Sequence, residues 1–280
     1  MKIVNTVAEL RQALSQVDAA GVGFVPTMGA LHEGHISLVE RARRENPTVV
    51  VSVFVNPTQF NDPNDLRNYP RTPEADAALL EAAGVDVVFM PSVEEMYPTP
   101  DTRVFDFGTI DKVMEGATRP GHFNGVAQVV SRLFEMVQPA RAYFGEKDFQ
   151  QIAVIRAMMR QLGIGLELIP CPIVRGEDGL ALSSRNTLLT PEHRAAAPDI
   201  YAALRLGAEA VGTKTPAEVV SIIEQAIEKS GLLKVIYVEV VDGDSLESIA
   251  EWKSAASGRV QCCVAVQAGA IRLIDNIKLV

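Results

Sequence analysis

Short apolar runs and amphipathic stretches alternate along the first part of the chain, and this alternation predicts strands and helices in turn. The longest apolar run is nearly all β-branched, as is typical of a strand that is covered on both faces. We expect strands at about 22–25, 48–55, 85–90, 141–144 and 166–170. We expect helices between them, at about 6–18, 34–45, 72–83, 124–137 and 149–162. This order of elements favours an α/β fold with a parallel sheet.

The pattern changes in the later part of the chain, where helices come first and strands follow. We expect helices at about 191–211 and 215–230, then strands at 235–241, 260–266 and 270–274, the last two as a hairpin. The sequence therefore predicts two domains, a Rossmann-like parallel-sheet domain over 1–176 and a smaller α+β domain over 177–280. In the less regular regions, we expect a loop at 61–71 and a short strand at 104–107.

Composition and charge narrow the class of protein. Apolar residues make up 48% of the chain and charged residues 22%, as in soluble globular proteins. The net charge of −9 argues against non-specific binding to nucleic acid or to an anionic membrane. The three cysteines form neither a zinc pattern nor a disulfide framework, and no apolar run has membrane-spanning length. We expect a cytoplasmic protein without a nucleic-acid partner, a membrane partner or a protein-borne metal site.

A glycine-containing turn after the first long strand is the clearest candidate site. Pro26 ends that strand, and Gly29 and Gly34 permit a tight loop before the next helix. Such a turn is expected to aim free backbone N–H groups and a helix N-terminus at one point, which suits a phosphate. His32 and His35 lie at that point. Many α/β folds carry such a turn for packing alone, so this stretch leaves both interpretations open.

Two further polar segments follow predicted strands, at the sheet edge where open α/β folds bind ligands, and two more candidates lie in other loops. Asn56 and Gln59 follow one strand, and either turn geometry or ligand binding explains them. Gly145-Glu146-Lys147-Asp148 follows another, with Gln150 and Gln151 in the next helical turn. The loop Ser183-Ser184-Arg185 offers hydroxyl groups and a guanidinium that suit a polyphosphate, although a polar interdomain loop would look the same. Arg119 and His122 either face substrate or fix their own turn.

Six segments together resemble the pantoate–β-alanine ligase (pantothenate synthetase) family. They are PTMGALHEGH at 26–35, FVNPTQF at 54–60, YPRT at 69–72, RPGHF at 119–123, FGEKDFQQ at 144–151 and DGLALSSRN at 178–186. Six matches in order are far more specific than one. The His-x-Gly-His segment and the Ser-Ser-Arg loop also resemble the ATP signatures of the wider superfamily of nucleotidyltransferases and class I aminoacyl-tRNA synthetases. The chain departs from the family at Leu182, where Met is usual, and at Asn124, where Arg is frequent.

The resemblance implies the condensation of pantoate with β-alanine, driven by ATP, through a pantoyl adenylate. It implies Mg²⁺ with ATP, no tightly bound organic cofactor, and a homodimer. By resemblance, His35, His32, Lys147 and Arg185 are catalytic, with His35 as proton donor. Gln59 and Gln151 would bind pantoate, and Gln59 also β-alanine. The implied ATP-binding residues are Met28, Gly29, Ala30, Leu31, His32, Glu33, Gly34, His35, Gly145, Glu146, Lys147, Asp148, Val174, Leu182, Ser183, Ser184 and Arg185.

Two other classes of function share part of this pattern. A nucleotidyltransferase would keep the histidines and the Ser-Ser-Arg loop, but it would have no need for the two glutamines, Gln59 and Gln151. A regulatory module would bind ATP without turnover. Pyrophosphate release that depends on pantoate separates the ligase from both.

Overall fold

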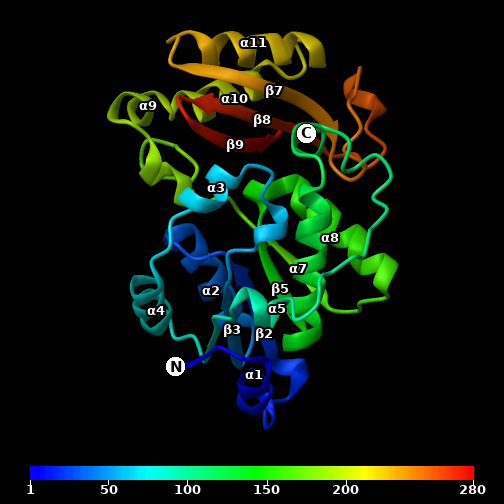
Figure 1. Ribbon diagram of the computed structural model, residues 1–280. Coiled ribbons are helices and arrows are strands. Elements are labelled where there is room, and N and C mark those ends of the chain that lie inside the picture. The colour runs from blue at the N-terminus through cyan, green and yellow to red at the C-terminus, as the bar shows by residue number, and fades with distance from the viewer. The chain divides into compact units, whose positions relative to one another are not determined.

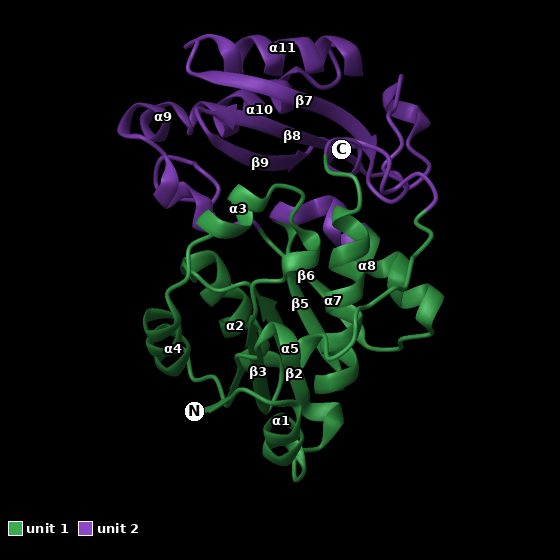
Figure 2. Cartoon of the chain, viewed as in Figure 1, with its two compact units in different colours: residues 1–107, 119–146, 154–172 green, residues 108–118, 147–153, 173–280 purple.

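The computed structural model describes residues 1–280, which form two compact units (Figure 1). Figure 2 colours them separately: unit 1 comprises residues 1–107, 119–146 and 154–172, and unit 2 comprises residues 108–118, 147–153 and 173–280. Each unit has its own sheet, a parallel one in unit 1 and an antiparallel one in unit 2. This confirms the predicted fold class.

The sheet of unit 1 has six strands in the order β1-β4-β3-β2-β5-β6, all of them parallel. The strands are β1 (Lys2–Val4), β2 (Val22–Thr27), β3 (Thr48–Val53), β4 (Val87–Phe89), β5 (Arg141–Gly145) and β6 (Glu167–Cys171). From β2 the chain adds β3 and β4 on one side, then continues with β5 and β6 on the other. The direction of winding thus reverses between β2 and β5, and this reversal is where open α/β sheets bind ligands.

Helices cover both faces of the parallel sheet. The helices of unit 1 are α1 (Val7–Leu14), α2 (Glu33–Glu45), α3 (Pro63–Asn68), α4 (Pro73–Ala82), α5 (Val93–Met96), α7 (His122–Val137) and most of α8 (Phe149–Leu162). Neighbouring residues of a strand point to opposite faces. Val25 of β2 belongs to a buried cluster with Leu38 of α2, whereas the Phe24 ring meets Phe134 of α7 edge-on at 6.4 Å. Because both faces are covered in this way, the central strands are almost wholly apolar.

Unit 2 is built on the antiparallel sheet β7-β8-β9, with β7 (Leu233–Asp242), β8 (Val260–Ala268) and β9 (Ile271–Lys278). Its helices are α6 (Met114–Thr118), α9 (Pro191–Ala196), α10 (Asp199–Ala210) and α11 (Pro216–Glu228). Cys262 packs with buried residues of α10 and α11, whereas Cys263 lies in a second cluster with Met114 and Phe149. The two helices therefore cover one face, and the segments 108–118 and 147–153 cover the other.

Polar contacts explain why these two short segments belong to unit 2. The Gln150 amide donates to the carbonyls of Ile110 (2.7 Å) and Val113 (2.8 Å), and its oxygen accepts from the Glu115 N–H at 3.0 Å. The Glu115 carboxylate in turn accepts from Arg272 of β9. A single boundary at residue 176 would divide the chain into two continuous pieces. The contacts above instead join segments that are distant in sequence, so each compact unit contains several separate stretches of the chain. The two-domain division at that residue stays a prediction.

Several predicted elements were wrong in detail. The expected loop at 61–71 contains α3, which starts with Asp62 as N-cap and Pro63 at the first helical position. The helix expected at 191–211 is split into α9 and α10, with Pro198 between them. The strand β1 was not predicted.

Residues 104–107 do not form the predicted strand. Side chains of α7 bind this segment in place of a partner strand: Asn124 accepts from the Phe105 N–H (3.0 Å) and donates to the Arg103 carbonyl (3.1 Å). Asn124 is one of the two departures from the family pattern, and here it anchors an extended segment. None of the helices in the chain combines the length and the apolar character needed to cross a bilayer.

Candidate active site

A buried carboxylate holds the loop that follows β2. Asp76, in the first turn of α4, is 1% exposed and accepts from the backbone N–H groups of Ala30 (3.0 Å) and Leu31 (2.8 Å). The loop passes close to it, since a Cβ added at Gly29 would lie 2.9 Å from an Asp76 oxygen, and Gly29 has a φ of +80°. Ala30 also has a positive φ of 49°. The loop therefore depends on both a glycine and the Asp76 carboxylate.

The expectation that this loop aims free backbone N–H groups at a phosphate was wrong for four of those groups. Besides the two N–H groups that Asp76 binds, the Gly29 N–H donates to the Thr27 hydroxyl at 3.3 Å. The Gly34 N–H, at the start of α2, donates to Nδ1 of His32 at 3.1 Å. These four donors already have protein acceptors and are not free to bind an anion.

The two histidines of the loop lie together at the N-terminus of α2. His32 is the N-cap residue, and its ring centroid is 4.1 Å from that of His35. Nδ1 of His35 accepts from the His32 N–H at 3.3 Å, as Nδ1 of His32 accepts from Gly34. Because each Nδ1 is an acceptor, we infer that each neutral ring carries its proton on Nε2. Both imidazoles are thus held as Nε2–H donors.

Gln59 lies beside the same loop, in the short helix Pro57–Gln59 that follows β3. The residue is buried, and its Nε2 is 2.9 Å from the Met28 sulfur, just after β2. Its backbone carbonyl accepts from His122 at 2.7 Å and from Arg119 at 3.4 Å. The structure thus brings Gln59 together with Met28. Arg119 and His122 thus bind the backbone of the turn at Gln59, and whether they also face substrate stays a prediction.

Unit 2 brings together a second group of predicted site residues through β9. The Lys147 carbonyl accepts from the Asn276 side chain at 3.0 Å. The neighbouring Asp275 forms a bidentate ion pair with Arg175, with distances of 2.5 and 2.9 Å. Arg175 lies at the start of the loop that carries the two serines. Lys147 and this loop are therefore tied to adjacent residues of one strand.

The loop itself has a defined turn. The Leu182 N–H donates to the Val174 carbonyl at 3.0 Å, which closes the loop at its base. Ser183 caps the short helix Ser184–Leu188, and its hydroxyl accepts from the Arg185 N–H at 3.3 Å. Leu182, Ser183, Ser184 and Arg185 are thus held in one turn.

The remaining predicted residues are divided between the units. Gly145 ends β5 and Glu146 follows it, both in unit 1, whereas Lys147, Asp148 and Gln151 belong to unit 2. No group of three or more His, Cys, Asp or Glu side chains is arranged to hold a metal ion. That the two groups of residues act on the same ligand stays a prediction.

Sequence reasoning missed Asp76, Arg175 and Asp275, which hold the loops of the candidate site, and Tyr97, whose hydroxyl donates to Asn56 at 2.9 Å. An acidic residue in the first turn of a helix is a common helix-start signal, so Asp76 did not stand out. Arg175 and Asp275 are a hundred positions apart, which no local pattern reveals. Tyr97 follows a four-residue helix, in a region where the apolar residues show no regular spacing.

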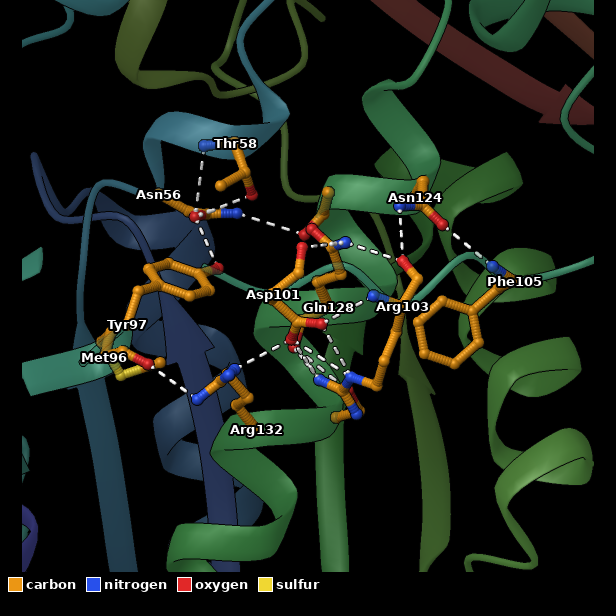
Figure 3. Close-up of polar contacts among 12 residues, drawn as sticks. Asn56, Thr58, Met96, Tyr97, Asp101, Arg103, Phe105, Asn124, Gln128 and Arg132 are labelled. Atoms are coloured by element: carbon orange, nitrogen blue, oxygen red, sulfur yellow. Dashed lines mark hydrogen bonds and ion pairs between the residues drawn. The ribbon is translucent and has the colours of Figure 1, made fainter. Parts of the chain in front are cut away.

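An ion-pair cluster around a buried carboxylate lies next to Tyr97 (Figure 3). The Asp101 side chain is 2% exposed and is paired with Arg103 (2.5 Å) and Arg132 (2.9 Å). Hydrogen bonds from Arg103 come first among the causes that hold the pKa of Asp101 well below its ordinary value. The folded state therefore favours the ionised carboxylate.

Asp101→Asn is expected to lower the free energy of unfolding by about 2 kcal/mol at pH 7, because two guanidinium groups lose a buried partner. The pKa of Asp101 is lowered in the folded state, so the carboxylate's contribution is fully present above its ordinary pKa of about 4 and is lost as pH falls below it. In urea unfolding, the difference in the free energy of unfolding between Asp101→Asn and wild type should be smaller near pH 3 than at pH 7. The exposed Asp199→Asn serves as control, with an expected change below about 0.5 kcal/mol. A difference that is the same at both pH values would contradict this account.

Comparison with known proteins gives one consistent result. The family model described as pantoate-beta-alanine ligase matches residues 2–278. The pantothenate synthetase of Porphyromonas gingivalis is 56% identical over 280 residues, which cover 99% of each chain. The pantothenate synthetase of Thermus thermophilus is 52% identical over 281 residues, covering 100% of this chain and 99% of its own.

Solved structures agree with the sequence comparisons. The crystal structure of a Thermus thermophilus pantothenate synthetase matches with a TM-score of 0.93 at 50% identity, covering 100% of this chain and 99% of that one. The pantoate-beta-alanine ligase of Francisella tularensis, described as complexed with beta-gamma ATP and beta-alanine, matches with a TM-score of 0.83 at 35% identity, covering 100% and 98%. These matches confirm the resemblance seen in the sequence. The chain belongs to the pantoate–β-alanine ligase family of enzymes.

Proposed function

We propose that this enzyme condenses pantoate with β-alanine at the expense of ATP, giving pantothenate, AMP and pyrophosphate through a pantoyl adenylate. The observation that carries the proposal is the match to one ligase family over residues 2–278. The Francisella tularensis relative, whose description includes beta-gamma ATP and beta-alanine, supports the choice of substrates.

In the first half-reaction a carboxylate oxygen of pantoate attacks the α-phosphorus of ATP. The bond from that phosphorus to the bridging oxygen of the β-phosphate breaks, and pyrophosphate leaves. Negative charge develops on phosphate oxygens, so catalysis consists mainly of positioning and of electrostatic stabilisation. Mg²⁺ would arrive with ATP as part of the substrate and neutralise part of the phosphate charge.

The predicted catalytic residues have the chemistry for this step. His32 and His35 carry donors at Nε2 for phosphate oxygens, with His35 as proton donor. Lys147 and Arg185 supply fixed positive charge, and Ser183 and Ser184 donate to oxygens. The contact set for ATP is completed by Met28, Gly29, Ala30, Leu31, Glu33, Gly34, Gly145, Glu146, Asp148, Val174 and Leu182.

In the second half-reaction the neutral amine of β-alanine attacks the acyl carbon of the adenylate. The bond between that carbon and the phosphate oxygen breaks, AMP leaves, and the new amide loses a proton. Gln59 and Gln151 bind pantoate, because an amide both donates to a carboxylate and accepts from a hydroxyl. Gln59 also contacts β-alanine. We further propose that the enzyme is a homodimer and acts in the cytoplasm.

Pyrophosphate release with pantoate and ATP tests this function, with β-alanine withheld or added. Without β-alanine the enzyme should release about one pyrophosphate per active site and stop, because the adenylate cannot react further. With β-alanine, release should continue and match the formation of AMP and pantothenate. Release that requires a phosphorylated acceptor instead of pantoate would identify a nucleotidyltransferase. ATP binding without any turnover would identify a regulatory module.

A further inference from the structure

The Asn56 side chain has only one orientation that satisfies its neighbours (Figure 3). The residue is 1% exposed, and its oxygen accepts from the Tyr97 hydroxyl (2.9 Å), the Thr58 hydroxyl (3.1 Å) and the Thr58 N–H (3.4 Å). Its nitrogen donates to the Gly125 carbonyl at 3.2 Å and to Oε1 of Gln59 at 3.3 Å. A reversed amide would place its oxygen against the Gly125 carbonyl and its nitrogen against the Thr58 N–H.

The orientation of Asn56 determines that of Gln59. Because Oε1 of Gln59 accepts from Asn56, its Nε2 points the other way, toward Met28 of the loop after β2. Gln59 therefore directs its N–H donors toward the loop after β2, which is the loop that carries the two histidines. Oxygen atoms of a carboxylate or a hydroxyl are the matching acceptors.

Tyr97 is itself held in place by contacts on its ring and its backbone neighbour. The Arg132 guanidinium carbon lies 5.2 Å from the centroid of the Tyr97 ring, and Arg132 donates to the Met96 carbonyl at 3.1 Å. Arg132 is fixed in turn by its ion pair with Asp101. Burial raises the pKa of the Tyr97 hydroxyl, so this group remains a proton-bearing donor at neutral pH.

We propose that Tyr97 is a positioning residue whose hydroxyl, acting through Asn56, sets the orientation in which Gln59 offers its N–H groups to pantoate. The proposal rests on the proposed function, in which Gln59 binds pantoate. Tyr97 touches neither the substrate nor the reacting atoms in this account. Without its hydroxyl, the Asn56 oxygen keeps only the two donors of Thr58, and the reversed amide becomes more accessible.

Tyr97→Phe tests this role, since it removes the hydroxyl and keeps the ring beside Arg132. We expect kcat/KM for pantoate to fall about tenfold, the effect of one buried hydrogen bond, while KM for ATP stays within about twofold. Tyr143→Phe is the matched control, because the Tyr143 hydroxyl is bound to Glu45 and Asn46, apart from the Gln59 network. It removes a hydroxyl from a ring that is fully buried, and it should leave KM for pantoate unchanged.

A double-mutant cycle with Gln59→Ala separates positioning from a general structural effect. If Tyr97 acts through Gln59, adding Tyr97→Phe to Gln59→Ala should cause almost no further loss of kcat/KM for pantoate. Full additivity of the two losses, or equal effects of Tyr97→Phe on pantoate and ATP, would overturn the inference and leave the proposed function standing. Pantoate kinetics that Gln59→Ala does not change would overturn both the role of Gln59 and the inference that depends on it.

Discussion

His35→Ala is expected to slow pantoate-dependent pyrophosphate release by about 10²–10³-fold, the usual loss when one preorganised donor to a developing oxyanion is removed. Lys147→Ala should have an effect at least as large, because a unit charge 4 Å from a phosphate oxygen is worth about 4 kcal/mol at an intermediate dielectric. Neither change removes a core side chain. His35 is partly exposed, and the tie from Asn276 binds the backbone carbonyl of Lys147.

Rapid-quench measurement of pyrophosphate with pantoate and ATP, without β-alanine, isolates this half-reaction. His193→Ala and Lys229→Ala are the matched controls, one histidine and one lysine outside the proposed site, and both should stay within about twofold of wild type. Circular dichroism and thermal unfolding establish that each variant is folded. A wild-type rate for either His35→Ala or Lys147→Ala would remove that residue from the catalytic assignment.

Asp76→Ala is expected to lower the free energy of unfolding by about 2–4 kcal/mol, because two backbone N–H groups in the loop after β2 lose their acceptor. The same change should reduce pyrophosphate release strongly, since this loop leads directly into His32 and His35. Asp76→Asn keeps one acceptor oxygen at the same size, so its effects should lie between wild type and Asp76→Ala.

Amide hydrogen exchange shows whether the effect is local. In wild type the N–H groups of Ala30 and Leu31 should exchange slowly, and in Asp76→Ala they should exchange faster by more than the overall loss of stability requires. A variant with wild-type stability and wild-type exchange at these two positions would show that the carboxylate does not hold the loop.

Local pattern was enough to predict most strands of unit 1, and it also picks out the candidate site residues, whose roles stay a prediction. Strands such as β3 are buried on both faces, so their sequences are unbroken apolar runs. The histidines, Gln59 and Lys147 stand out because polar side chains directly follow such runs. The short strand β1 did not stand out, since two of its three residues are exposed.

The contacts that assemble each group of residues could not be read from the sequence, because their partners are distant along the chain. Asp76 reaches back over forty positions to Ala30, and Asn276 reaches Lys147 across more than a hundred. Free N–H groups were expected because the turn was considered without the rest of the fold. In the folded unit, Asp76 occupies two of them.

Oxygen transfer from pantoate to AMP tests adenylate formation most directly. Pantoate labelled with heavy oxygen in its carboxylate is incubated with ATP, Mg²⁺ and β-alanine, and the products are examined by mass spectrometry. Because the carboxylate oxygen that attacks phosphorus leaves with AMP, we predict one labelled oxygen in each AMP and one in each pantothenate carbonyl. Unlabelled AMP, or label in the pyrophosphate, would contradict the mechanism.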